Sequence, residues 1–539
     1  MTEEQYYRIA RACDRLLRHP ESTVEWIAIP WLHMLNEHPV HLARYGDLAA
    51  NLDSTRERGT PLRPGLRLLK RGGTSAYTYA SLTKNLIQAA VHLGRRNAVL
   101  DARDGQKGTV CASKTVDAVI VSHLVNVDHL ELGDDFYFGR MQAVLADAGL
   151  SSLLLLRNQT DHPTTDLLER SRRDGPIGRL LLPDVTSLSE EADFIRRCLK
   201  AREQLRRVEL IAPSLFDRQV ARIAGDRVVS GDVVANLRLY SQIVSVCRQF
   251  RPTAVIALYE GHAWERCVWH AARASRDVVL CVGYQHTIFR RHSYAVKRSL
   301  GGGGRYDPDL ILTVGDFTRD ILKASHELGD RCVLTLGTHR WKDGSSPAGA
   351  PMFTPTFLVL PEGIESECVY LFEFALECAR RFPGVHFILR THPVLPFGKI
   401  QSRLRGYRGL PANVEVSHNA AIEDDFARSG YVLYRGSSAV IYGILSGLKP
   451  YYVGKPGEMS IDPLDGLLAW REQVSSVGEF IDKYASYQTR AHSHRNDDGE
   501  WRVALAFCER YVQPLKQEII SRMMELAKKA SRDEIAGNS

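Results

Sequence analysis

The chain has 539 residues, of which 44% are hydrophobic and 25% are charged, and its formal net charge is +7. It is long enough for two or three domains, while the N-terminus lacks a signal-peptide core and no apolar run reaches the roughly 18–20 residues that cross a bilayer. No dense Lys/Arg block is interleaved with aromatic residues, so we expect a cytoplasmic protein that does not bind nucleic acid. The mild positive charge suits anionic nucleotides, acidic glycans or a membrane surface.

The ten cysteines are scattered and include no CxxC pair. This pattern is typical of reduced thiols and not of disulfides or zinc ligands. No group of oxygen ligands recurs at the spacing of a metal loop. We therefore expect neither a metal nor a cofactor.

Residues 1–96 are predicted to form a mainly helical N-terminal extension. Ile27, Trp31 and Leu35 recur at four-residue spacing, which suits one face of a helix. Pro30 favours a helix that begins at Trp31 over one that contains the proline. An apolar stripe that carries tryptophan is usually core and only sometimes faces a membrane.

A series of apolar runs between 97 and 336 predicts a parallel sheet with helices between the strands, which is a Rossmann-like lobe. The last of these strands is expected at 309–316. The predicted strands lie at 98–102, 117–123, 152–158, 207–214, 253–261, 278–286 and 309–316.

Two polar clusters follow predicted strands of this lobe. Glu260 comes just past a buried run, and Gly261 allows the turn. A carboxylate there can deprotonate a hydroxyl or act as a nucleophile, whereas Glu265 suits an ordinary helix start. Gln285 and His286 follow the next run and could hold acceptor hydroxyls or a sugar; a structural histidine is the alternative.

Two loop residues complete the candidates of this lobe. Asp135, in the run Gly133–Gly139, is the reserve catalytic carboxylate, although a solvated acidic turn would look the same. Arg290 could contact a carboxylate or phosphate of a substrate, or be a solvated loop residue.

A second alternating series spans Thr356–Gly454 and predicts another Rossmann-like lobe at 337–490, joined to the first by a Gly/Ser/Pro-rich stretch at 337–355. Ligands of such sheets bind beyond the carboxyl ends of the strands. Three polar clusters fall at such ends: Glu362 and Gly363; Arg390, His392 and Pro393; and Arg435, Gly436, Ser437 and Ser438.

The third cluster lies where a strand turns into a helix. The first N–H groups of a helix are unpaired and can bind phosphate, and serine is a good N-cap. Arg435 would add positive charge, and an ordinary capped helix is the alternative. In the second cluster, Pro393 favours an extended His392 and so places its imidazole at the rim of the sheet.

The order LPEGI, RTHP and GSS, followed by a helix and GLKPYYVG, resembles the nucleotide-binding half of GT-B glycosyltransferases, above all those that build bacterial capsule and O-antigen polysaccharide. The His-Pro and Ser-Ser pairs are similar to motifs with which Kdo transferases and polysialyltransferases hold a CMP-sugar. The pattern around Glu260 and the Gln-His pair also resemble features of surface-carbohydrate biosynthesis proteins.

The resemblance implies two Rossmann-like lobes with a cleft between them and a C-terminal helix, at 491–539, that packs back on the first lobe. It implies metal-independent transfer from a nucleotide-sugar donor, such as CMP-Kdo or a related CMP-sugar, to a glycan or lipid-linked glycan acceptor. Peripheral association with the inner membrane, or with other assembly enzymes, fits that role. The donor would contact the three clusters of the second lobe, with Glu260, His286 and Asp135 as catalytic candidates and Gln285 and Arg290 on the acceptor.

One position departs from the pattern. Many GT-B enzymes that use UDP- or GDP-sugars carry a glutamate where this chain has Tyr442, which argues against a UDP-sugar. Two other interpretations stay open: a sugar-nucleotide epimerase of the same layout, and a non-catalytic nucleotide- or carbohydrate-binding protein of polysaccharide assembly.

Overall fold

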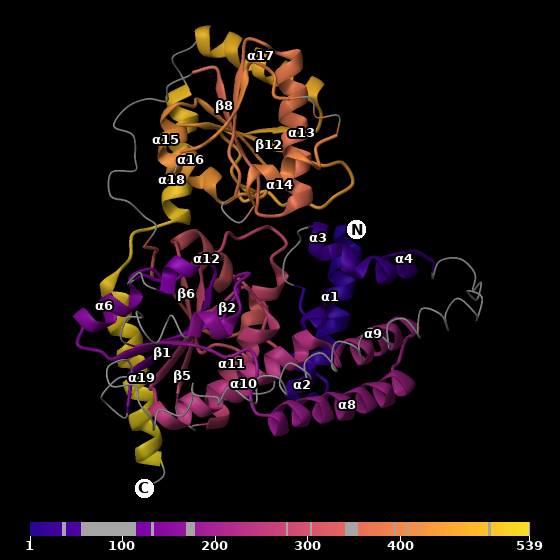
Figure 1. Ribbon diagram of the computed structural model, residues 1–539, viewed down its shortest axis with the longest axis vertical. Helices are drawn as coiled ribbons and strands as arrows, with labels where there is room; N and C mark the ends of the chain where they lie inside the picture. The colour runs from indigo at the N-terminus through magenta and orange to yellow at the C-terminus, as the bar shows by residue number, and fades with distance from the viewer. Residues whose placement is uncertain are drawn as a thin grey trace.

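The computed structural model shows two α/β lobes, one above the other in Figure 1. No helix in the part of the chain that it describes is long and apolar enough to span a membrane. The described residues are 1–34, 39–54, 115–130, 134–168, 178–275, 279–301, 304–339, 354–392, 395–405, 407, 409–419, 421–493 and 497–537.

The first lobe contains a seven-stranded parallel sheet in the order β3-β2-β1-β4-β5-β6-β7. The strands β1, β4, β5 and β6 at its centre are almost wholly buried, as expected where helices cover a parallel sheet. The strands of the sheet are β1 (Ala118–Leu124), β2 (Ser152–Asn158), β3 (Arg179–Leu181), β4 (Ala254–Leu258), β5 (Leu280–Gln285), β6 (Leu310–Thr313) and β7 (Cys332–Thr335).

Helices of this lobe cover the sheet and also build a separate helical core with the N-terminus. Capping boxes at Thr2 and Ser187 begin α1 and α8. The helices are α1 (Glu3–Leu17), α2 (Val24–Ile27), α3 (Pro39–Leu42), α4 (Gly46–Ser54), α6 (Met141–Asp147), α8 (Leu188–Ile211), α9 (Leu215–Arg227), α10 (Gly231–Phe250), α11 (Ala263–Ser275) and α12 (Asp316–Lys323).

The second lobe contains a six-stranded parallel sheet in the order β10-β9-β8-β11-β12-β13. Its strands are β8 (Thr356–Leu360), β9 (His386–Leu389), β10 (Val414–Val416), β11 (Tyr431–Tyr434), β12 (Lys449–Val453) and β13 (Glu472–Val474). Its helices are α13 (Glu365–Arg381), α14 (Phe397–Gln401), α15 (Ile422–Ala427), α16 (Ala439–Leu445) and α17 (Val477–Ser493).

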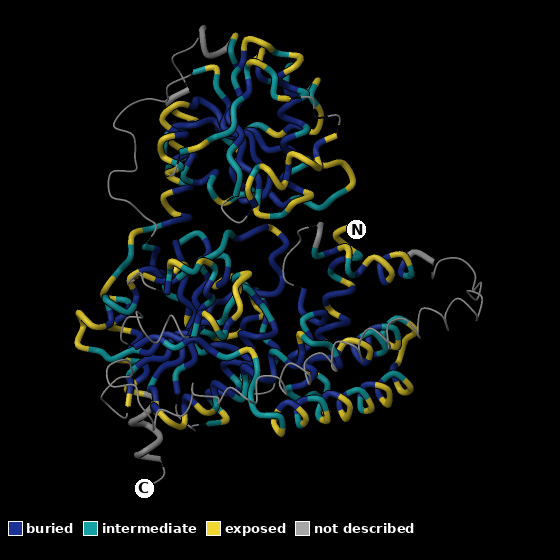
Figure 2. Tube along the Cα trace, in the orientation of Figure 1, coloured by how far each residue is buried: buried dark blue, intermediate teal, exposed yellow. Residues whose placement is uncertain are grey.

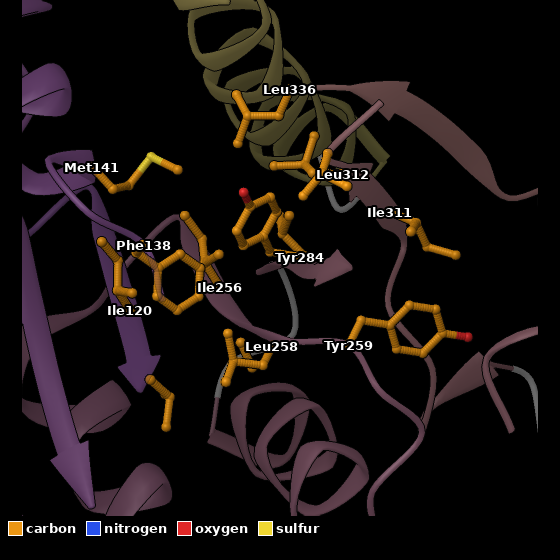
Figure 3. Packing of buried hydrophobic residues seen from close by; sticks show 14 of the residues in the cluster. Ile120, Phe138, Met141, Ile256, Leu258, Tyr259, Tyr284, Ile311, Leu312 and Leu336 are labelled. Atoms are coloured by element: carbon orange, nitrogen blue, oxygen red, sulfur yellow. The ribbon is translucent and has the colours of Figure 1, made fainter. Parts of the chain in front are cut away.

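The core of the first lobe packs around Tyr284 of β5. Figure 3 shows its ring near Phe138 and Ile256, and the hydroxyl donates a hydrogen bond to the carbonyl of Gly337 at 2.9 Å. Tyr259, just past β4, likewise donates to the carbonyl of Val296 at 3.0 Å. Figure 2 shows buried residues, in dark blue, at the centre of each lobe. Both tyrosines therefore fix the loops that follow the sheet.

The C-terminal segment returns to the first lobe, as expected. Helix α18 (Asp497–Tyr511) lies against α16 of the second lobe and α12 of the first, and α19 (Gln517–Gly537) runs along the first lobe beside β5 (Figure 1). The sequence predicts one helix over 501–529, but the structure has two. Pro514, between them, lacks an N–H and cannot continue a helix.

The segment between these two helices is bound to the ends of β6 and β7 by backbone hydrogen bonds. The N–H of Gln513 donates to the carbonyl of Val314 at 3.0 Å, and the carbonyl of Gln513 accepts from Thr338 at 2.8 Å. The N–H of Lys516 donates to Leu336 at 2.8 Å. The return segment is thus an integral part of the first lobe.

The predicted two-lobed α/β fold is confirmed by the two strand orders and the returning helix. The boundary between residues 336 and 337 falls between β7 and β8 and stays a prediction, since 340–353 lie outside the described residues. The predicted strand at 98–102 lies outside them as well.

Two strand predictions are wrong. Residues 207–214 belong mainly to α8, which ends at Ile211; Val208 lies on the buried face of this helix, whereas Leu210 and Ile211 are exposed. The strand at 309–316 is not the last, because β7 follows it.

At the N-terminus, Pro30 begins a short 3₁₀ helix, Pro30–Leu32, and does not sit inside a helix. Trp26 and Trp31 are buried in the helical core, so this stripe is core and not a membrane-facing patch. The described cysteines form no disulfide, and Cys332 is the exposed one among them.

Candidate functional site

Each sheet reverses its strand order at one place, between β1 and β4 in the first lobe and between β8 and β11 in the second. At such a switch point the connections diverge, and ligands bind in the crevice beyond the carboxyl ends of the strands. Glu260 follows β4, while Glu362 and Gly436 follow β8 and β11. The predicted polar clusters therefore occupy both switch points.

In the first lobe, Glu260 is the centre of a histidine cluster. Leu258 of β4 pairs with Tyr284 of β5, so the residues after these two strands leave the sheet side by side. His286 Nε2 lies 3.4 Å from one carboxylate oxygen of Glu260, and His262 Nε2 lies 2.8 Å from the other. The structure thus brings together Glu260 and His286 and adds His262, which the sequence analysis did not single out.

The turn that carries Glu260 is built by Glu265. The buried Glu265 carboxylate accepts backbone N–H bonds from Glu260, Gly261 and His262 at 2.9, 2.9 and 3.1 Å. Gly261 has φ +88°, and a side chain there would overlap Ala295. Burial raises the pKa of Glu265 to about 7. Glu265 is therefore a helix-start carboxylate that shapes the loop.

The charges of the cluster support one another. Burial favours the neutral form of Glu260, but the hydrogen bond from His262 and the charges of nearby histidines together lower its pKa to about 2. Burial also opposes the charged form of His262, yet the bond to Glu260 and the charge of Glu265 leave the pKa of His262 raised above 6.5. Glu260 is thus ionised at neutral pH, beside an imidazole that can exchange a proton there.

A fourth group, His123, was missed by the sequence analysis. It lies near the end of β1, the neighbour of β4, and its ring centroid is 4.8 Å from that of Trp264. Burial, assisted by Arg157, lowers the pKa of His123 to about 3. The ring of Tyr137 contacts both His123 and His286, with centroid distances of 6.1 Å and 4.8 Å. Its position as the last residue of the predicted strand at 117–123 could have marked His123 as a candidate.

Asp135 and Gln285 face their own loops. The Asp135 carboxylate accepts from Ser122 Oγ at 3.0 Å and from the N–H groups of Tyr137 and Phe138 at 2.9 and 2.7 Å. Burial raises the pKa of Asp135. Gln285 Nε2 donates to the carbonyl of Thr287 at 2.6 Å, and its buried Oε1 has no partner among the described residues. Both side chains therefore organise turns, and Gln285 retains one free acceptor.

In the second lobe, Glu362 and Gly436 lie side by side. Leu360 of β8 pairs with Tyr434 of β11, and each of the two residues comes two positions later. A Cβ at Gly436 would overlap the Glu362 carboxylate, so any side chain there would force that carboxylate to move. The crevice of this sheet is therefore narrow and carries a carboxylate.

His392 approaches the same place from β9. A Cβ at Gly363 would lie 2.9 Å from His392 Nδ1, so the imidazole packs directly on that glycine. Burial lowers the pKa of His392, although the charge of Glu362 opposes this. The imidazole is thus neutral at physiological pH and can donate or accept a hydrogen bond. Pro393 lies outside the described residues.

Arg290 connects the two lobes. It belongs to the loop after β5, and its guanidinium donates to the Glu362 carboxylate at 3.2 Å. The side chains are only 10% and 14% exposed. Arg290 Nε is buried without a partner in the part of the chain described. The pair therefore joins the two strand-end clusters and leaves a buried donor at the junction.

The two other arginines have carboxylate partners inside the second lobe. Arg390 pairs with the buried Asp425. Arg435 is 1% exposed and pairs with Glu367 and, at 2.6 Å, with Glu458. The positive charge of Arg435, which was expected to face a phosphate, is therefore neutralised by these two carboxylates. Both arginines hold loops in place around the crevice.

The serines precede a short helix. Ser437 is half-buried and Ser438 is exposed. Ser438 is the N-cap of the seven-residue α16, yet its side chain makes no capping hydrogen bond. The Ser438 hydroxyl, which the sequence analysis expected to cap the helix, therefore does not do so.

Among the described residues, one group has the spacing of metal ligands: Glu260, His262 and Glu265, whose ligand atoms lie within 4.8 Å of one another. The Glu265 oxygens already accept three backbone N–H bonds, which makes them poor metal ligands. The group fits a proton-transfer site better than a metal site.

No family model matches the chain. No curated protein matches it either. Among solved structures, the glycosyltransferase SnogD from Streptomyces nogalater aligns with 77% of this chain and 100% of its own, at 13% identity and a TM-score of 0.40. The UDP-GlcNAc 2-epimerase from Neisseria meningitidis, bound to UDP-GlcNAc, aligns with 76% and 99%, at 11% identity and a TM-score of 0.41. Similarities this low carry no argument about activity, and the fold assignment rests on the strand orders above.

Proposed function

We propose that this chain is a glycosyltransferase that moves a sugar from a nucleotide donor on the second lobe to an acceptor hydroxyl at the first. The main support is the pairing of the two switch points: a Glu–His cluster at one, a Glu–His–Gly crevice at the other, and the Arg290–Glu362 ion pair between them. A transferase needs proton transfer on one side and an anion-binding site on the other, within reach of each other.

The proposed donor is a CMP-sugar, such as CMP-Kdo, and the proposed acceptor is a glycan or lipid-linked glycan of surface polysaccharide. Glu362, Gly363 and His392 would contact the nucleotide together with Pro393, Ser437 and Ser438. The buried Nε of Arg290 is suited to an anionic group of the substrate. Arg390 and Arg435 would act indirectly, through the loops they brace.

The transfer breaks the bond between the anomeric carbon and a phosphate oxygen, which leaves with the electron pair. The acceptor oxygen forms the new bond and loses its proton. A general base works best with a pKa near the operating pH. Glu260, with a pKa of about 2, is a weak proton acceptor, whereas His262 has a raised pKa. We therefore assign the proton to His262, with Glu260 orienting it and stabilising the imidazolium.

Turnover by Glu260→Gln and His262→Gln tests this assignment. Each should fall by about 10²–10⁴ while nucleotide affinity is kept, and the double variant should be little worse than either alone because the two groups act as a unit. If both variants stay active and Asp135→Asn is inactive, the catalytic carboxylate is Asp135.

Two controls separate the competing functions. Activity should survive a chelator; loss on chelation and recovery with magnesium or manganese would contradict metal-independent transfer. Conversion of a nucleotide sugar without any acceptor would favour an epimerase. Nucleotide binding with no turnover, unaffected by changes at Glu260 and His286, would favour a binding protein.

A further inference from the structure

The turn between α8 and α9 carries exposed apolar side chains. The two helices run side by side and project from the first lobe (Figure 1). At their turn, Leu210, Ile211 and Leu215 are 77%, 74% and 73% exposed. A single exposed aliphatic residue is ordinary, but three lie here within six positions around one turn, and exposed apolar residues that gather in one place mark a contact surface. We call Leu210, Ile211 and Leu215 the hairpin tip.

The fold does not require apolar residues at the hairpin tip. The inner faces of both helices are already buried through Leu205, Val208 and Val220 in the helical core. Helix α9 has its own N-cap, since Ser214 Oγ accepts the N–H of Asp217 at 3.0 Å. Polar residues at the tip would leave this packing unchanged, so its apolar character needs another explanation.

Cations flank the hairpin tip. Arg207 and Arg218 are exposed, and neither pairs with a carboxylate among the described residues. The acidic neighbours are already paired: Glu209 with Arg222 at 3.8 Å, and Asp217 with Arg15 at 2.5 Å. The hairpin tip thus presents an apolar centre beside two positive charges that have no carboxylate partner in the part of the chain that the structure describes.

We propose that the hairpin tip docks on an anionic lipid bilayer. The three aliphatic side chains would enter the boundary between headgroups and acyl chains, with the arginines against lipid phosphates. Three side chains cannot supply the roughly 800 Å² per partner of a standard protein interface. A bilayer can bind a protein through so few inserted side chains, and anionic lipids attract the basic residues beside them.

Vesicle binding of the full chain tests the proposal without reference to sugar transfer. The wild-type protein should sediment with phosphatidylglycerol-containing vesicles more than with pure phosphatidylcholine vesicles, and high salt should weaken the binding. Leu210→Ser, Ile211→Ser and Leu215→Ser combined should reduce the partition coefficient about tenfold or more. The matched control is Leu468→Ser, since Leu468 is 96% exposed in the second lobe, and it should bind like the wild type.

A second variant examines the charges. Arg207→Gln combined with Arg218→Gln should reduce the preference for anionic vesicles while the hairpin tip stays apolar. Unchanged binding by the triple serine variant would overturn the proposal, as would no wild-type binding to anionic vesicles. Concentration-dependent dimerisation in solution that the triple serine variant abolishes would also overturn it, in favour of a second copy of the chain.

Discussion

Replacing Gly436 by alanine should disrupt the junction between the two lobes. The added Cβ would lie well inside 3.0 Å of the Glu362 carboxylate, where neighbouring atoms cannot remain. A retreat of the carboxylate on the order of 1 Å stretches its 3.2 Å bond to Arg290 beyond hydrogen-bonding distance. A hydrogen bond between charged groups contributes roughly 1.5–3 kcal/mol, and moving the end of the Glu362 side chain adds little to this. We expect a loss of about 1.5–3 kcal/mol in the free energy of unfolding.

Urea denaturation of four proteins measures this effect: wild type, Gly436→Ala, Glu362→Ala and the double variant. If the alanine acts by displacing Glu362, it should cost less than about 1 kcal/mol once Glu362 is absent. Equal losses in both backgrounds would refute the reasoning. The matched control is Gly454→Ala, in the same lobe, where the nearest atom to an added Cβ lies 3.6 Å away; its stability should change little.

Other predictions follow from the same geometry. Ser438→Ala and His392→Ala should each weaken CMP binding about tenfold or more, because a charge-assisted hydrogen bond contributes roughly 1.5–3 kcal/mol; calorimetry that finds both unchanged would refute the donor site. Asp135→Ala should lower the free energy of unfolding by about 1–3 kcal/mol, since it orphans donors of its turn, and an unaltered denaturation midpoint would contradict this. Turnover should fall as pH drops through the pKa of His262, which lies above 6.5, since a protonated imidazole cannot accept a proton; a flat pH profile between about pH 5 and 8 would contradict the assignment.

Side chains at the ends of consecutive strands could be predicted from the sequence to lie together. Side chains that come together from distant parts of the chain could not. Glu260 and His286 could be paired because they end consecutive strands of one parallel sheet. His123 could not, because β1 lies beside β4 only through the strand order, and β4 follows it after more than one hundred residues. The burial of Arg435 depends in the same way on Glu367 and Glu458, which come from distant segments.

The wrong strand at 207–214 has a different cause. A short apolar run next to a proline has the same composition in a strand and at the end of a helix, and periodicity over so few residues does not separate the two. The charged residues before Val208 belong to the same long helix. About one residue per turn of this helix is buried against the core. The apolar residues of this run that face away from the core, Leu210 and Ile211, belong to the hairpin tip.

The hydrogen bonds of Gln513 with the ends of β6 and β7 bear on how the chain folds during synthesis. Residue 513 follows the end of β7 by about 180 positions, so at about 5–20 residues per second the ribosome needs roughly 10–35 s to supply it. During that interval the first lobe lacks the segment that pairs with Val314, Leu336 and Thr338. The second lobe, whose sheet is continuous in sequence, is therefore expected to reach its native structure before the first lobe does.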